Sequence, residues 1–368
     1  AEMNVAKNWV QPKLGINDDS PELHAQDTFK GGDGKGDMKV INVMTHEALD
    51  AAKWCRDYLG VRFEDDNLFF FGGHSRKRAL IPVGHTGTEF IAKFQAKADE
   101  LGIPVITNMK AEELIKNKDG RVVGVKATMD GSEYTFNAKG GVVLATGGFG
   151  ANPEMVKKYN PKIDERFKTT DAPGTTGEAL YMAERAGAQL VNMGYIQTYP
   201  ICDPISGAIE LIADARFDGA IMLNQEGKRF VEELQRRDVL SEAILNQTGQ
   251  YCWVLWNDNI GKISNTVKAH ANEYEAFTKQ GIMTTCDDLK CIADFTKIPF
   301  DQLQKTVKRV SDMAGKGNDK DFNHRAGLMD MQQGKYYVIK AVPSTHHTMG
   351  GVRINEKAEA LTAEGKVI

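Results

Sequence analysis

The chain of 368 residues is 41% hydrophobic and 26% charged, a composition ordinary for globular proteins and a length that suits two domains. Its formal net charge of −4 gives no sign of a nucleic-acid partner or of binding to an anionic membrane surface. No apolar run in the sequence is long enough to cross a bilayer, so we expect no membrane insertion.

The first predicted elements are a loop, two helices and a strand. Residues 33–37 are only Gly, Asp and Lys, which predicts a surface loop. Apolar residues recur at helical spacing over 45–59, with Thr45 as a candidate cap, and again over 87–101. The apolar run 104–107 then predicts a short strand.

A hairpin, a buried strand and a helix are predicted next. Residues 122–127 and 134–136 alternate like paired strands, with Asp130-Gly131 as the tight turn between them. The continuous apolar run 141–145 is typical of a buried parallel strand. Residues 177–187 carry an apolar face at helical spacing, which predicts a helix.

The character of the sequence changes near Tyr195. Turns rich in aromatic residues and proline follow, with helices predicted over 240–245 and 300–314 and a polar loop over 316–321. Strand-like alternation returns at 352–354. The pattern as a whole predicts an α/β fold.

This return predicts that one domain is inserted into another. We expect the first domain to comprise residues 1–194 and 343–368, and the inserted domain to comprise residues 195–342.

The cysteines are few, odd in number and without a C-x-x-C pair. Such a set argues against a disulfide framework and against a zinc site. We therefore expect buried free thiols at Cys55, Cys202, Cys252, Cys286 and Cys291.

Two glycine-containing motifs stand out. Residues 144–150 read Leu-Ala-Thr-Gly-Gly-Phe-Gly and place small residues where a strand is predicted to end, which is where ligands bind in open α/β sheets. Residues 344–351 read Ser-Thr-His-His-Thr-Met-Gly-Gly, so two imidazoles lie beside glycines that allow close approach to a flat ligand. A loop without a ligand at the first motif, and two solvated histidines at the second, are the alternative interpretations.

Together these motifs resemble the fumarate reductase and succinate dehydrogenase flavoprotein family. The resemblance implies an FAD-binding Rossmann-like domain with an inserted α+β capping domain, and FAD as the cofactor, with room for FMN on a separate domain of a longer protein. Residues 170–178, Thr-Asp-Ala-Pro-Gly-Thr-Thr-Gly-Glu, match a further FAD-contacting segment of the family. The positions implied to contact FAD are Met3, Asn4, Ala145, Thr146, Gly147, Gly148, Thr170, Asp171, Glu178, His347, Thr348 and Met349.

The family begins with a G-x-G-x-x-G turn that holds the FAD pyrophosphate at a helix N-terminus, and it ends with a further FAD-contacting segment. Neither is present among these residues. The resemblance therefore implies an internal slice of a longer flavoprotein, in which the FAD-binding domain is incomplete. We expect this slice alone to bind FAD poorly.

Arg237 is the expected catalytic residue. It precedes Asp238 and follows an Asn-x-x-Gly-x-Arg-Phe segment, and the resemblance implies that this arginine is the general acid. A guanidinium with a pKa above about 12 is a poor acid, but a carbon that gains carbanion character when hydride reaches its neighbour is basic enough to take the proton. Without the resemblance, the Arg-Arg-Asp run is more simply a solvated helix face.

The residues near the expected substrate differ from those of fumarate reductases. These place a Thr-Glu pair shortly before the arginine that matches Arg216, whereas Ile212 and Ala213 stand here and Asp214 follows. The family's substrate-binding histidine in a Trp-His-Pro context is matched by Tyr199. A carboxylate at Asp214 repels a second substrate carboxylate and attracts a cationic or hydrogen-donating ring.

These differences predict a substrate with one carboxylate and one basic aromatic end, which urocanate fits. His346 is expected to hold the carboxylate, and Phe71 to offer a face for stacking, although 69–71 is more simply core. The implied reaction is reduction to imidazole propionate, with hydride from flavin N5 and a proton from Arg237. Alternatives are another enoate reductase acting on fumarate, methacrylate or a cinnamate-like acid, the oxidative direction, and a non-catalytic fragment unable to hold FAD.

Family analogy also implies partners and a location. We expect a small unsaturated carboxylate and an upstream electron donor as partners, no nucleic acid, and a periplasmic location in anaerobic respiration.

Overall fold

The computed structural model describes residues 2–368 and combines helices with strands, as the sequence predicts. The chain forms two compact units. The first contains the chain up to Val143 together with Met182–Gln189 and Val352–Ile368, and the second contains Leu144–Tyr181 and Leu190–Gly351. The division expected from the sequence pattern, residues 195–342 against the rest, remains a prediction.

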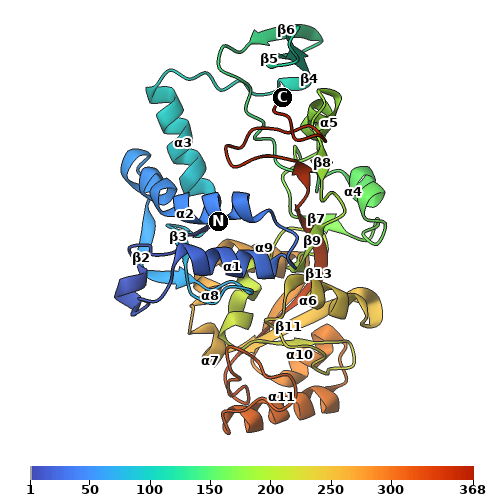
Figure 1. The fold of residues 1–368 in the computed structure, drawn as a ribbon. Coiled ribbons are helices and arrows are strands. Elements are labelled where there is room, and N and C mark those ends of the chain that lie inside the picture. Colours follow the sequence, from blue (N-terminus) through green and yellow to red (C-terminus); the bar gives the residue numbers. More distant parts are fainter. Residues whose placement is uncertain (1) are drawn as a thin grey trace. The chain divides into compact units, whose positions relative to one another are not determined.

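Two small antiparallel sheets form the first unit. One has the order β1-β3-β2 and the other is a meander, β4-β5-β6, whose strands lie side by side in Figure 1. The elements of this unit are β1 (Met3–Asn4), η1 (Gln11–Leu14), α1 (Pro21–Gly31), α2 (Met38–Lys53), η2 (Trp54–Tyr58), β2 (Phe63–Phe69), β3 (Ala79–Pro82), α3 (Thr88–Glu100), β4 (Lys110–Lys116), β5 (Val122–Met129) and β6 (Ser132–Asn137).

A buried ion pair connects distant segments of this unit. The guanidinium of Arg78 is fully buried and donates to Asp19 at 2.7 and 3.1 Å and to Asp27 at 2.6 Å. Breaking such a pair leaves an uncompensated buried charge, at a cost of about 3–5 kcal/mol. These contacts therefore hold the chain around residues 19–27 against β3.

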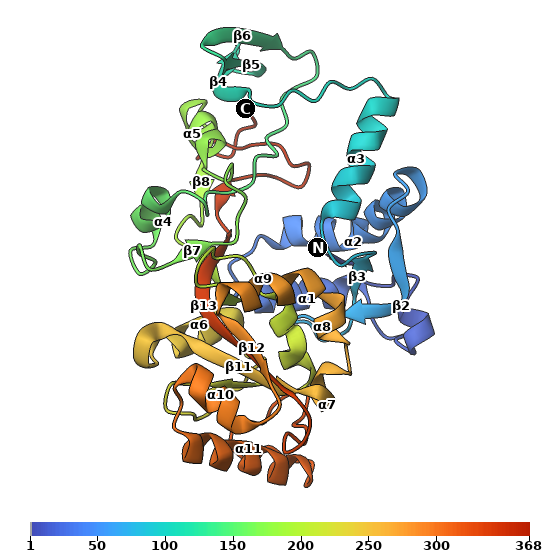
Figure 2. The same ribbon diagram turned by 180° about the vertical axis from the view of Figure 1, so that it is seen from behind.

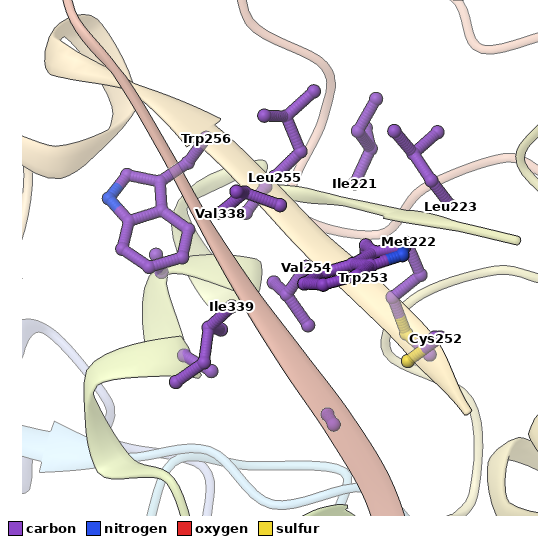
Figure 3. Packing of buried hydrophobic residues seen from close by; sticks show 14 of the residues in the cluster. Ile221, Met222, Leu223, Cys252, Trp253, Val254, Leu255, Trp256, Val338 and Ile339 are labelled. Carbon is purple, nitrogen blue, oxygen red and sulfur yellow. The ribbon is translucent and has the colours of Figure 1, made fainter. Parts of the chain in front are cut away.

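The second unit is built on an antiparallel sheet of order β10-β11-β13-β12, formed by β10 (Ile221–Leu223), β11 (Cys252–Asn257), β12 (Met283–Cys286) and β13 (Tyr336–Thr348). All six residues of β11 are buried, and Trp256, Leu255 and Val338 lie in the cluster drawn in Figure 3. Helix α10 (Leu289–Thr296) packs beside β12 and β13, and α11 (Phe300–Ala314) lies against α10 (Figure 2). This is the main hydrophobic core of the unit.

Strand β13 continues beyond this core. Its C-terminal part pairs antiparallel with β9 (Ile196–Cys202) and parallel with β7 (Lys168–Thr169), so that Ser344 lies opposite Tyr199. The remaining elements of the chain are α4 (Pro153–Tyr159), α5 (Glu178–Arg185), β8 (Leu190–Val191), η3 (Leu211–Asp218), α6 (Arg237–Leu245), η4 (Thr248–Gln250), α7 (Asp258–Gly261), α8 (Thr266–Ala269), α9 (Ala271–Gln280) and β14 (Gly351–Val352).

Several predicted elements are confirmed. Helix α11 has the predicted bounds, and α3, α5 and α6 occupy the other predicted helical stretches. The β5–β6 hairpin turns at Asp130 and Gly131, which have φ of 51° and 78° as a tight hairpin turn requires. The loops at 33–37 and 316–321 are also present.

The predicted start of the helix over 45–59 is wrong. Helix α2 begins at Met38, because the side chain of Asp37 accepts the backbone N–H of Lys39 at 2.9 Å and caps the helix. Thr45 lies buried inside the helix, where its hydroxyl donates to the carbonyl of Asn42 at 3.2 Å.

The strands predicted at 104–107 and 141–145 are also wrong. Both segments are irregular, and Val105 and Val143 are 58% and 89% exposed. A strand needs a neighbour that accepts its backbone hydrogen bonds, and no neighbour pairs with either segment within residues 2–368.

Two further expectations need correction. Cys286 and Cys291 form a disulfide with a Cα–Cα distance of 5.8 Å, although Cys55, Cys202 and Cys252 are buried free thiols as predicted. The run 69–71 is not core throughout, since Phe70 is 47% exposed.

Candidate active site

Arg237 begins helix α6, which packs against strand β9. Its Nη1 donates a hydrogen bond to Oε1 of Gln197 at 2.7 Å. Its guanidinium carbon lies 4.7 Å from the ring centroid of Tyr199, a cation–π distance. Because Gln197 and Tyr199 are two residues apart on one strand, both side chains project from the same face and hold the guanidinium between them.

Tyr199 lies at the centre of this cluster and contacts Arg237, Arg216 and His346. It is 6% exposed, and its hydroxyl accepts a hydrogen bond from Nη2 of Arg216 at 3.3 Å. The ring of His346 lies 5.2 Å away, centroid to centroid. Burial and the charge of Asp214 raise the pKa of the phenol, so Tyr199 is a neutral hydroxyl at physiological pH.

Asp214 and Arg216 come from the 3₁₀ helix η3. The Nε of Arg216 lies 4.0 Å from Oδ1 of Asp214, and its Nη1 donates to the backbone carbonyl of Glu233 at 3.3 Å. Arg216 is buried, whereas Asp214 remains partly exposed. Ile212 and Ala213 beside them are fully buried apolar residues, so the polar side chains of this part of the helix are those of Asp214 and Arg216.

His346 lies near the C-terminal end of β13. Its Nδ1 is 2.7 Å from the hydroxyl of Thr170. The pKa of His346 is lowered to about 4 by burial and by the positive charges of Arg237 and His347. At neutral pH His346 is therefore an uncharged imidazole that can donate a hydrogen bond without adding charge.

Glycines bring the two motif segments together. A Cβ at Gly148 would lie 1.7 Å from Oγ1 of Thr348, which accepts the backbone N–H of Phe149 at 3.3 Å. A Cβ at Gly150 would lie 1.8 Å from Oδ2 of Asp171, whose pKa is raised by burial. No side chain fits at either glycine, so the side chains of Thr348 and Asp171 lie directly on the backbone of the first motif.

This convergence fits a flat cofactor such as the flavin of FAD. Gly147 has φ of 72°, in the left-handed region that favours glycine. Small or amphipathic side chains surround that backbone at the surface of the unit, namely Ala145, Thr146, His347 and Met349, all exposed. An accessible backbone with small side chains allows a ring system to approach closely.

The structure gathers most of the predicted site residues in the second unit. Direct contacts connect Arg237, Tyr199, Arg216, Asp214, His346 and Thr170, and Thr348 packs on Gly148. Glu178 is instead exposed and bonded to the hydroxyl of Thr176.

Three predicted residues belong to the first unit. Phe71 stacks on Phe69 with ring centroids 5.2 Å apart, and Met3 packs against the apolar cluster around Val5. Asn4 has a buried Oδ1 with no hydrogen-bond partner within residues 2–368. Their roles toward a ligand remain predictions.

Gln197 is a contact that the sequence reasoning missed. It lies two residues before Tyr199 on a strand, and this spacing could have indicated it.

In the described part of the chain, no three His, Cys, Asp or Glu side chains are grouped to hold a metal ion, and no helix has the length and apolarity of a membrane span.

The chain is similar to known FAD-binding proteins over nearly its whole length. The FAD binding domain family matches residues 3–368. The chain is 40% identical to urocanate reductase of Eggerthella lenta over all of its own length and 61% of that protein. It is 33% identical to NADH:acrylate oxidoreductase of Vibrio harveyi over 95% of its own length and 36% of that protein.

Among solved structures, the open conformation of a flavocytochrome c3 fumarate reductase superposes with a TM-score of 0.80 at 31% identity, covering all of this chain and 63% of that one. The chain thus spans less than two thirds of each of these proteins. The match to the family extends over nearly every residue, and the chain therefore belongs to the FAD binding domain family, as a flavoprotein of the fumarate reductase type with FAD as its cofactor.

Proposed function

We propose that the intact protein reduces the C=C bond of an α,β-unsaturated carboxylate, with urocanate as the substrate and imidazole propionate as the product. The observation that carries the proposal is the cluster around Tyr199, where a guanidinium, a neutral imidazole and an arginine–carboxylate pair converge within one unit. The likeness to a urocanate reductase supports the choice of substrate.

The two ends of the substrate would meet different groups. His346 is uncharged and would donate a hydrogen bond to the substrate carboxylate. At the other end, Asp214 would accept a hydrogen bond from a ring N–H, and the Tyr199 ring would contact the planar substrate. A second carboxylate about 4 Å from Asp214 would be repelled by about 4 kcal/mol at an effective dielectric constant near 20, which disfavours a dicarboxylate.

Arg237 would supply the proton. FAD, when bound and reduced by the electron donor, would supply the hydride for the β-carbon, and the electron pair of the C=C bond would take the proton of Arg237 at the α-carbon. The guanidinium of Arg237 is held by Gln197 and by the Tyr199 ring, so it keeps a fixed direction. Such orientation is the main contribution of a general acid that is intrinsically weak.

A smaller enoate is the second candidate substrate. The likeness to an NADH:acrylate oxidoreductase favours it, as do the apolar side chains of Ile212 and Ala213 where fumarate reductases carry polar ones. Acrylate has one carboxylate and no ring, so it would use His346 and Arg237 but leave Asp214 without a partner.

The domain division and the setting of the protein are proposed with the function. Residues 1–194 and 343–368 would hold FAD, and residues 195–342 would form the capping domain. Two electrons are consumed in each turnover, so an upstream electron donor is required. The Cys286–Cys291 disulfide supports a periplasmic location, because disulfides persist in oxidising compartments.

The test is a substrate panel on the complete protein with reduced viologen as the electron donor. Urocanate, acrylate, methacrylate, cinnamate and fumarate are compared by viologen oxidation and by product identification. We expect urocanate to give the highest kcat/KM and imidazole propionate to form. Rapid reduction of fumarate or acrylate with urocanate inert would contradict the proposal.

A further inference from the structure

The 3₁₀ helix η3 carries both Asp214 and Arg216, and its first turn is held by another part of the chain. The first N–H groups of a helix have no partner within the helix. Glu210, at the N-cap, makes no side-chain cap hydrogen bond. The first turn of η3 is therefore satisfied from outside the helix.

Glu273 supplies this cap from helix α9, 61 residues away in sequence. Its Oε2 accepts the backbone N–H of Ile212 at 2.8 Å, and the N–H of Leu211 also bonds to its carboxylate. A carboxylate at a helix N-terminus is favoured by the partial positive charge of the N–H groups there.

The other backbone group of Ile212 is also held by a side chain. The hydroxyl of Thr266, buried in helix α8, donates to the carbonyl of Ile212 at 3.0 Å. Helices α8 and α9 follow each other and lie side by side in Figure 2. Two neighbouring helices thus fix the peptide groups on both sides of one residue of η3.

Glu210 does not cap the first turn of η3 with its side chain. It is fully buried, and neither of its carboxyl oxygens has a hydrogen-bond partner within residues 2–368. Burial, with Asp203 and Glu273 nearby, raises the pKa of Glu210 well above its usual range, which favours the uncharged form of this carboxyl. The side-chain cap of η3 is therefore provided by Glu273.

We propose that Glu273 is a positioning residue that fixes the first turn of η3 and thereby directs Asp214 and Arg216 toward the ring end of the substrate. The inference rests on the proposed function for the identity of that substrate. Asp214 is only two residues beyond Ile212, and a 3₁₀ helix advances about 2 Å per residue, so a shift of the first turn moves the carboxylate directly. The end of the substrate that binds His346 would be held by β13, whereas the hydrogen bond of the Glu273 carboxylate goes to η3.

The test compares Glu273→Ala with Glu273→Gln and with Glu275→Ala in the complete protein. The glutamine keeps an oxygen that accepts both N–H groups, and Glu275 is an exposed residue on the same helix, which makes it a matched control. KM and kcat are measured for urocanate and for acrylate, and hydrogen exchange is measured for the amides of residues 211–216.

We expect Glu273→Ala to raise KM for urocanate about tenfold, with a much smaller rise for acrylate, and to accelerate exchange at 211–216 by about tenfold. Glu273→Gln and Glu275→Ala should stay close to the wild type. Wild-type KM and exchange in Glu273→Ala, or equal rises in KM for both substrates, would overturn the proposal.

The two proposals fail in different ways. If the wild-type protein does not reduce urocanate, the proposed function is wrong, and exchange alone then decides the role of Glu273: unchanged exchange overturns it and faster exchange supports it. If Glu273→Ala does not fold, Thr266→Val removes the second tether of Ile212, and exchange at 211–216 must rise for the inference to stand.

Discussion

Arg237 lies over the ring of Tyr199, with the guanidinium carbon 4.7 Å from the ring centroid. The same tyrosine bonds Arg216 through its hydroxyl. One buried aromatic side chain therefore orients two arginines, one by its face and one by its edge. The proposed proton donor, Arg237, and the arginine beside Asp214, Arg216, therefore contact different parts of Tyr199.

Replacing Arg237 by Ala should lower kcat for urocanate by a factor of about 10²–10⁴, the usual contribution of a general acid, without loss of bound FAD. Turnover and the flavin absorbance of the complete protein are the measurements. Arg236→Ala is the matched control, because this neighbouring arginine is exposed and pairs with Asp238. Near-wild-type turnover in Arg237→Ala would remove Arg237 from the acid role.

Replacing Asp214 by Ala should affect ring-bearing substrates selectively. The lost hydrogen bond to a charged group is worth about 1.5–3 kcal/mol, so kcat/KM for urocanate should fall by about one to two orders of magnitude. Acrylate, which has no ring, should be much less affected. Equal losses for urocanate and acrylate would contradict recognition of the ring by Asp214.

Tyr199→Phe keeps the ring beneath Arg237 and removes the hydroxyl that Arg216 bonds. The free energy of unfolding should fall by about 1–3 kcal/mol, because a buried guanidinium loses an acceptor. Urea denaturation of the variant and wild type measures this change. Tyr199→Leu removes the ring as well, and it should reduce kcat further than Tyr199→Phe if the ring orients Arg237.

The imidazole of His346 should stay neutral down to about pH 4. Its pKa is lower in the folded state than in the unfolded state, so the unfolded state binds more protons between these two values. Stability linked to His346 is therefore complete above about pH 6.5 and is lost as the pH falls toward 4. NMR titration of the ring, assigned with His346→Asn, tests this. A titration midpoint near 6.5 would be incompatible with a buried neutral ring.

The raised pKa of Glu273 predicts a change of stability with pH that is opposite in sign to that linked to His346. Burial raises its pKa to about 7, with a further contribution from Asp214, while the hydrogen bonds from Ile212 and Leu211 oppose the shift. The folded state then binds more protons than the unfolded state between about pH 4.5 and pH 7, so stability declines as the pH rises through this interval. Glu273→Gln should abolish that part of the decline when unfolding is followed from pH 5 to 8. An identical pH dependence in both proteins would show that Glu273 does not titrate in this range.

Sequence periodicity predicted elements whose partners are local. The amphipathic pattern of α11 and the turn residues between β5 and β6 are sufficient to specify those elements. The run 141–145 has the composition of a buried strand, but composition does not reveal whether another strand pairs with it.

The residues of the candidate site also differ in whether the sequence could predict them. The motif at 344–351 indicated His346 because the resemblance depends on those residues. The cap from Glu273 to Ile212 could not be predicted, since it joins residues 61 positions apart and leaves no periodic signal. The contact of Gln197 could have been predicted, because its spacing from Tyr199 on one strand places both side chains on the same face.

Strand β13 joins the main core to the candidate site without a break. Val338 and Ile339 lie in the sheet centre, and His346 lies seven residues further along the same strand. Local opening around His346 therefore has to compete with the hydrogen bonds that pair β13 with its neighbouring strands. A small cavity made at Val338 should therefore weaken substrate binding at His346 as well as the fold, because one strand carries both residues.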